Sequence, residues 1–194
     1  MILSNVEIQK ALDEGRLVIE PQPQPTKPEL GKYCPYDTHS VDLRLHKEIT
    51  VPKGGPFVYD LMESGSLAEL ISKHSEKFTL RENQPFHLKP NQFILGRTLE
   101  RIRLPITKGL PYLAARIEGK SSRARCGVLV HFTAPTVHPG WEGPLTLEII
   151  NLGPTKFALH PEMPIAQLIV EQIFGSLTPN PSQFQNQTTP EGLR

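Results

Sequence analysis

Cysteine, long apolar runs and an excess of charge of either sign are scarce in this sequence. Two cysteines, Cys34 and Cys126, cannot form a disulfide framework, as is typical of a reduced, cytoplasmic protein. No run approaches the roughly 20 apolar residues of a membrane span, and residues 1–10 lack the features of a signal peptide. The net charge is +1 with acids and bases interspersed, so neither nucleic acid nor a membrane is an expected partner. A few local cations would still suffice to bind a small polyanion.

Metal-binding patterns are missing as well. The zinc-dependent nucleobase deaminases carry H-x-E and P-C-x-x-C, and two distant cysteines cannot supply the second motif. The seven histidines show no H-E-x-x-H or similar pairing. Neither a P-loop nor a G-x-G-x-x-G fingerprint is present. The sequence therefore predicts no structural or catalytic zinc.

Proline is abundant, with 20 residues, which is about double the usual share of about 5%. Prolines and glycines separate many short apolar runs with strand-like alternation, such as residues 93–105 and 144–153. This pattern predicts a mainly β sandwich or barrel-like fold over a single domain of residues 1–175. Residues 176–194 are polar and proline-containing, which predicts a flexible C-terminal tail able to order over a ligand.

Two short helices are expected beside the strands. Ser4 and Glu7 have the spacing of a capping box, and Gly15 is placed to end that helix. Ser66 and Glu69 repeat the spacing at the start of a second apolar-periodic stretch.

The segment EGKSSRARCG, residues 118–127, is the densest polar constellation in the chain. Lys120, Arg123 and Arg125 lie close together with two hydroxyls and flanking glycines. Guanidinium groups and free backbone N–H groups suit phosphate oxygens. A solvated turn between strands explains the same composition equally well, so both interpretations stay open.

A single carboxylate interrupts the apolar segment PLTLEIINLG, residues 144–153. Strand alternation places Leu147 on one face and Thr146 and Glu148 on the other. Glu148 is either a solvent-facing acid or a carboxylate whose pKa is raised by apolar surroundings for acid–base work near neutral pH. His131, between two apolar residues, is expected to be a core residue, and His138 a turn residue.

Several segments together resemble the dCTP deaminase branch of the dUTPase-like superfamily, nearly from end to end. The similarity runs through residues 1–21, SVDLRLHKEI, LGRTLERIRLP, EGKSSRARCGVLVH, TAPTVHPGWEGPLTLEIINLG and MPIAQLIVEQI. The S-S-x-A-R and P-G-W-x-G-x-x-T-L-E patterns are specific in combination, although each is weak alone.

The resemblance implies a dUTPase-like distorted β-barrel or jelly roll with two short helices, assembled as a homotrimer with active sites between subunits. It implies hydrolysis of dCTP to dUTP and ammonia without zinc, with Mg²⁺ held by the triphosphate and by no protein ligand. Glu148 would be the general acid and base, and Ser121 and Arg125 would position the water and stabilise the tetrahedral centre. The implied nucleotide contacts are Lys120, Ser121, Ser122, Arg123, Ala124, Arg125, Ala134, His138, Trp141, Thr146, Leu147, Glu148, Gln167 and Gln187.

The sequence departs from the family pattern at three positions that bear on function. His138 stands where an aspartate usually precedes P-G-W, which argues against efficient dUTP hydrolysis. Lys120 replaces an arginine, and Gln183 replaces a lysine of the tail, which predicts a weaker lid over the triphosphate. Two other functions stay open: a dUTP diphosphatase or bifunctional enzyme that releases dUMP and pyrophosphate, and a nucleotide-binding trimer without catalysis.

Overall fold

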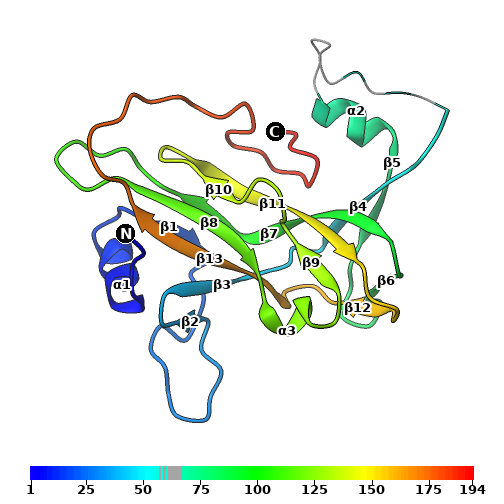
Figure 1. Ribbon diagram of the computed structural model, residues 1–194, viewed down its shortest axis with the longest axis horizontal. Coiled ribbons are helices and arrows are strands. Elements are labelled where there is room, and N and C mark those ends of the chain that lie inside the picture. Colours follow the sequence, from blue (N-terminus) through cyan, green and yellow to red (C-terminus); the bar gives the residue numbers. More distant parts are fainter. Residues whose placement is uncertain (57, 59, 61–66) are drawn as a thin grey trace.

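The computed structural model (Figure 1) describes residues 1–56, 58, 60 and 67–194 and is mainly β, as predicted. In chain order its elements are α1 (Asn5–Asp13), β1 (Val18–Glu20), β2 (Tyr36–Asp37), β3 (Ser40–Arg44), β4 (Glu48–Pro52), α2 (Leu67–Lys73), β5 (Ser75–Thr79), β6 (Phe86–Leu88), β7 (Phe93–Arg103), β8 (Leu113–Gly119), α3 (Ser121–Ala124), β9 (Val128–Val130), β10 (Thr136–Val137), β11 (Glu142–Asn151), β12 (Phe157–Leu159) and β13 (Pro164–Gln172).

The helices follow the predicted caps where the structure describes them. Ser4 caps α1 by accepting a hydrogen bond from the backbone N–H of Glu7 at 3.3 Å. Helix α2 lies where the second helix is predicted, although Ser66 falls outside the described residues. Helix α3, a single short helical segment, was not among the two predicted helices. In the described part of the chain, no helix has the length and apolar character needed to cross a membrane.

Two sheets carry most of the strands. One has the order β5-β4-β7-β11-β9 with β1 also paired to β7, and the other has the order β10-β8-β13-β3-β2. Strands β6 and β12 form a separate two-stranded sheet. Over the described residues the strands form open sheets and no closed barrel, and the predicted mainly β, dUTPase-like fold is confirmed.

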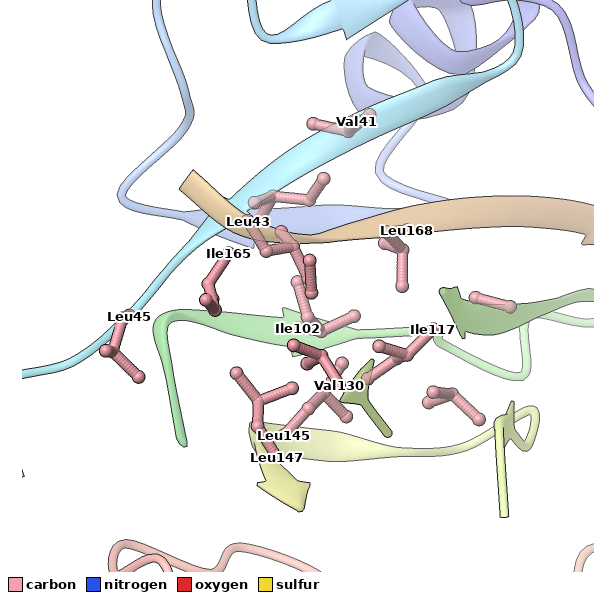
Figure 2. Packing of buried hydrophobic residues seen from close by; sticks show 14 of the residues in the cluster. Val41, Leu43, Leu45, Ile102, Ile117, Val130, Leu145, Leu147, Ile165 and Leu168 are labelled. Carbon is pink, nitrogen blue, oxygen red and sulfur yellow. The ribbon is translucent and has the colours of Figure 1, made fainter. Parts of the chain in front are cut away.

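Apolar side chains from the two main sheets meet in one hydrophobic core (Figure 2). Figure 2 shows Leu43 and Leu168 from one sheet packed toward Ile102 and Leu147 from the other. Along β11 the buried positions alternate with half-buried ones, which confirms that Leu147 points into the core and Glu148 away from it.

A buried ion pair connects the two sheets through this core. Glu100 on β7 is fully buried, and its carboxylate accepts hydrogen bonds from the backbone N–H of Arg44 at 2.8 Å and from its Nε at 2.7 Å. Burial raises the pKa of Glu100, while the bonds from Arg44 act in the opposite direction. Removing one partner would leave an uncompensated buried charge, so the pair fixes how the sheets face each other.

The C-terminal tail, residues 176–194, contains no helix or strand and follows β13 back across the molecule. Figure 1 shows the tail in orange and red beside β10 and β11, on the side of the sheet away from α3. Gln187, Pro190 and Glu191 are buried although the tail is polar in composition. The tail therefore packs against the outer face of the β5-β4-β7-β11-β9 sheet.

Candidate active site

Three neighbouring strands place Glu148 in a row of side chains across the outer face of the sheet. The register pairs Thr50 on β4 with Leu95 on β7, and Leu95 with Glu148 on β11. Adjacent strands lie about 4.8 Å apart, so the Thr50 and Glu148 backbones are separated by about 10 Å. Leu95 thus forms an apolar floor between them.

A cavity of about 360 Å³ lies above this row. Apolar walls come from Leu67, Ile71, Leu95, Ile117, Val137, Trp141, Leu145, Phe184 and Pro190. Polar side chains come from His131, Thr136, His138, Thr146, Glu148, Ser182, Gln187 and Glu191, together with Ala134 at the rim. Among the described residues that line the cavity, none is lysine or arginine, so its charged side chains are carboxylates and histidines.

The side chain of His131 lies against Glu148. Its Nδ1 is 2.6 Å from Glu148 Oε2, and its Nε2 is 2.8 Å from the carbonyl oxygen of Ala134. A carbonyl only accepts hydrogen bonds, so Nε2 carries a hydrogen. When the imidazole is protonated, the 2.6 Å contact at Nδ1 is an ion pair with the carboxylate. Glu148 and His131 therefore form a close carboxylate–imidazole pair.

This pair reverses the pKa shift expected for Glu148. Burial alone would raise the pKa of Glu148, but the contact and opposite charge of His131 outweigh burial, and the pKa lies below its ordinary value. Burial would likewise lower the pKa of His131, and Glu148 raises it above its ordinary value. The prediction of a raised Glu148 pKa from apolar surroundings is wrong for the protein without nucleotide, because it did not include His131.

The backbone at the end of β9 brings His131 to this position. Strand β9 runs antiparallel to β11, and the backbone N–H of His131 donates to the carbonyl oxygen of Glu148 at 2.8 Å. His131 has a φ of 53°, an uncommon left-handed conformation that turns the chain toward Ala134. The sequence interpretation of His131 as a core residue missed this role, because no local pattern reveals which strand pairs with β11.

The cationic segment that was predicted to bind phosphate lies elsewhere in the chain. Residues 120–125 form α3 and its flanks, and none of them lines the cavity of Glu148. Figure 1 shows the ribbon of α3 beside the start of β9, whereas the tail lies beside β10 and the start of β11. Ser121, Ser122, Ala124 and Arg125 are exposed there.

Lys120 and Gln167 line a second, polar cleft beside β3. Lys120 Nζ pairs with the buried carboxylate of Asp42, and Gln167 Nε2 lies 3.4 Å from the same carboxylate oxygen. Tyr33 donates its hydroxyl hydrogen to the other oxygen of Asp42 at 2.8 Å. Within one chain, Lys120 is therefore neutralised by an acid and does not line the cavity of Glu148.

The other predicted residues divide between the cavity and the core. Ala134, His138, Trp141, Thr146, Glu148 and Gln187 meet at the cavity. Leu147 does not, since its side chain is fully buried in the core. Any contact of Leu147 with a ligand is therefore limited to its backbone.

The tail closes one side of the cavity through polar contacts with the sheet. Gln187 Nε2 donates to the carbonyl oxygen of Pro144 at 2.9 Å, and Thr146 Oγ1 donates to that of Pro190 at 3.1 Å. Glu191 reaches further, to Thr50 on β4 at 2.7 Å. The sequence analysis did not single out Glu191, and its position in a polar tail gives no signal of burial.

Over the described residues, no three histidine, cysteine, aspartate or glutamate side chains are grouped so as to hold a metal ion. The acid–base groups of the cavity are Glu148, His131 and His138, with Glu191 fixed by the sheet.

The fold and cavity define a mostly β protein with a carboxylate–imidazole pair on the outer face of an open sheet. Within that class, the chain belongs to the dCTP deaminase-like family, whose model matches residues 2–173. The family predicted from the sequence is thereby confirmed.

Individual relatives extend the comparison. A protein of Rhodospirillum rubrum named dCTP deaminase is 36% identical over 178 residues, covering 89% of this chain and 83% of the relative. A protein of Dictyoglomus thermophilum named dCTP deaminase, dUMP-forming, is 39% identical over 168 residues, covering 87% and 78%. The crystal structure of 2'-deoxycytidine 5'-triphosphate deaminase from Agrobacterium tumefaciens has a TM-score of 0.61 at 16% identity. That match covers 91% of this chain and 49% of the other. At that identity the likeness shows the shared fold alone.

Proposed function

We propose that this protein is a dCTP deaminase, which hydrolyses dCTP to dUTP and ammonia. One feature supports this activity above the others: Glu148 and His131 form a close carboxylate–imidazole pair inside a largely apolar cavity. Deamination of cytosine requires a group that removes a proton from water and returns protons to nitrogen. The family membership and the names of the relatives point to the same substrate.

In the proposed reaction, Glu148 takes a proton from water as the oxygen attacks C4 of the cytosine ring. The C4–N3 double bond opens, and the proton passes to N3, which gives a neutral tetrahedral centre. The proton of the new C4 hydroxyl then passes to the exocyclic nitrogen, the C4–N bond breaks, and ammonia leaves as the C4 carbonyl forms. His131 is a positioning residue, because its Nδ1 holds one oxygen of the Glu148 carboxylate.

The nucleotide would lie with its base and sugar in the cavity and its triphosphate outside. Two carboxylates and no lining lysine or arginine make the described cavity unfavourable for phosphate groups. The cations of residues 120–125 would then come from a neighbouring subunit, with Ser121 and Arg125 facing the Glu148 of the first. We therefore propose a cyclic homotrimer with one active site between each pair of subunits, and Mg²⁺ entering with the triphosphate.

No zinc is needed in this scheme, because the activation of water rests on Glu148 and its neighbours. The two other functions differ in their products. A bifunctional enzyme would release pyrophosphate, and some relatives are named dUMP-forming. His138, which lines the cavity where the family usually has an aspartate, does not favour that outcome. A nucleotide-binding trimer without catalysis would release neither product.

One assay distinguishes the three functions. The protein is incubated with Mg²⁺ and dCTP, and separately with dUTP, while ammonia, pyrophosphate and nucleotides are measured. Ammonia with accumulation of dUTP is the expected result. Pyrophosphate release would contradict it in favour of the bifunctional enzyme, and binding without products would favour the non-catalytic trimer. Glu148→Gln should abolish ammonia release, and a variant that retained it would refute the role of Glu148.

A further inference from the structure

The tail carries a second carboxylate into the wall of the cavity. The side chain of Glu191 is fully buried, and its Oε1 accepts a hydrogen bond from Thr50 Oγ1 at 2.7 Å. The ammonium group of Lys77 lies 3.5 Å from the same oxygen. Among the described residues, none forms a hydrogen bond with Oε2. Glu191 thus forms a buried contact with the sheet, although the rest of the tail is polar in composition.

The partners of Glu191 lie on the side of the cavity opposite Glu148. Thr50 on β4 pairs with Lys77 on β5 and, on its other side, with Leu95 on β7. On the other side, Thr146 of β11 holds the carbonyl oxygen of Pro190, the residue before Glu191. Residues 190 and 191 therefore span the cavity from β11 to β4.

The negative charge of Glu191 contributes to its contact with Thr50 and Lys77. Burial alone would raise the pKa of Glu191, but hydrogen bonding, chiefly from Thr50, together with the charge of Lys77 outweighs burial, so the pKa lies below its ordinary value. An ionised carboxylate in this position is tolerated because a hydroxyl and an amine compensate its lost hydration. Replacing Glu191 with alanine would remove the carboxylate, and Thr50 and the buried end of the tail would lose this contact.

We propose that Glu191 is a positioning residue that latches the tail over the cavity before nucleotide binds. The latch consists of Glu191, Thr50 and Lys77, and it holds Gln187 against β11. Its effect on turnover rests on the proposed deaminase function, whereas the latch itself can be measured without substrate.

The first experiment measures the tail in the full-length protein without nucleotide. Hydrogen–deuterium exchange of residues 184–193 should become about tenfold faster in Glu191→Ala and in Thr50→Val, since a buried bond to a charged group is lost. Thr50→Ser retains the hydroxyl and should exchange like the wild type. Lys77→Met should exchange only a few times faster, because Lys77 is more than half exposed.

Two controls keep this measurement specific. Glu76→Gln changes an exposed acid on the same strand as Lys77 and should leave tail exchange unchanged. Trp141, the only tryptophan in the chain, lines the cavity beside the tail, so acrylamide should quench its fluorescence more strongly when the tail opens. Wild-type exchange and quenching in both Glu191→Ala and Thr50→Val would overturn the latch, even if turnover changed.

The second experiment measures steady-state deamination of dCTP. If substrate must now order the tail itself, Glu191→Ala should raise KM about tenfold and change kcat by less than about twofold. An opened tail with unchanged KM would overturn the positioning role. If the wild type does not deaminate dCTP, the proposed function fails, and tail exchange still decides whether Glu191 latches the tail.

Discussion

The pairing of His131 with Glu148 determines how pH acts on individual residues of the cavity. The pKa of Glu148 is lowered, so its contribution to stability is present above its unfolded value and is lost as pH falls through the folded value. The pKa of His131 is raised, so its contribution is present below its unfolded value and is lost as pH rises through the folded value. Both charges stabilise the fold most between the ordinary values of 4.5 and 6.5.

Replacing His131 tests this predicted dependence of stability on pH. His131→Gln should lower the free energy of unfolding by about 1–2 kcal/mol near pH 6 and by clearly less near pH 9, where the wild-type imidazole has lost its charge. Urea unfolding at the two pH values measures the difference. His87→Gln, at an exposed histidine of β6, is the matched control and should show no such dependence. A cost for His131→Gln that is equal at both pH values would contradict the charged pair.

At the residue scale, the sequence predicted the outward face of Glu148 and missed the partner that sets its pKa. Alternation along β11 depends on neighbouring residues in the chain, so it is visible in the sequence. The contact with His131 depends on the pairing of β9 with β11 and on a left-handed φ at His131, and neither leaves a local pattern. For His138 the sequence is the more informative source, because only comparison with the family pattern shows that an aspartate usually stands at this position.

His138 gives a second prediction at this scale. His138→Asp should create or increase pyrophosphate release from dUTP with Mg²⁺, because a carboxylate at this position can accept the proton of a water that attacks phosphate. His138→Asn, of similar size and without a basic group, is the control and should release no more than the wild type. Equal pyrophosphate release by the aspartate and asparagine variants would show that the residue at this position does not decide dUTP hydrolysis.

At the scale of elements, strand β11 has a structural face and a functional face. Leu147 is fully buried in the core, and Glu148 faces the cavity. Most strands were predicted because their apolar alternation is local, whereas α3 was not predicted because four residues carry no helical periodicity. The buried ends of the tail were also missed, since Glu191 is buried only by contacts with distant strands.

Substitutions at two neighbouring residues test the roles of the two faces of β11 separately. Leu147→Ala should lower the free energy of unfolding by about 2–5 kcal/mol, because it leaves a cavity between the sheets. Glu148→Gln should change it by about 1 kcal/mol or less while abolishing turnover. Leu30→Ala, the same truncation at an exposed site, should have an effect within about 0.5 kcal/mol. If Glu148→Gln destabilised the protein as strongly as Leu147→Ala, the carboxylate would be structural.

At the scale of the whole molecule, the predicted site residues fall into two groups within one chain. Glu148, Thr146, His138 and Gln187 surround the cavity, whereas α3 lies beside the start of β9 and Lys120 pairs with Asp42 in the second cleft. The sequence predicted both groups, but spacing along the chain does not tell whether two groups meet within a subunit or between subunits. A ring in which α3 of one subunit faces the cavity of the next would bring them together.

Mixed trimers test that arrangement directly. Glu148→Gln and Arg125→Ala subunits are co-expressed with different tags, and oligomers that carry both tags are purified. In every mixed trimer, one junction places an intact Glu148 cavity against an intact α3, so about a third of the wild-type deaminase activity should return. A mixture of Glu148→Gln with His131→Gln, which damages the same cavity twice, should not exceed the mean of its parents. If Glu148 and Arg125 acted within one subunit, the first mixture would also remain inactive, and the proposed shared site would be wrong.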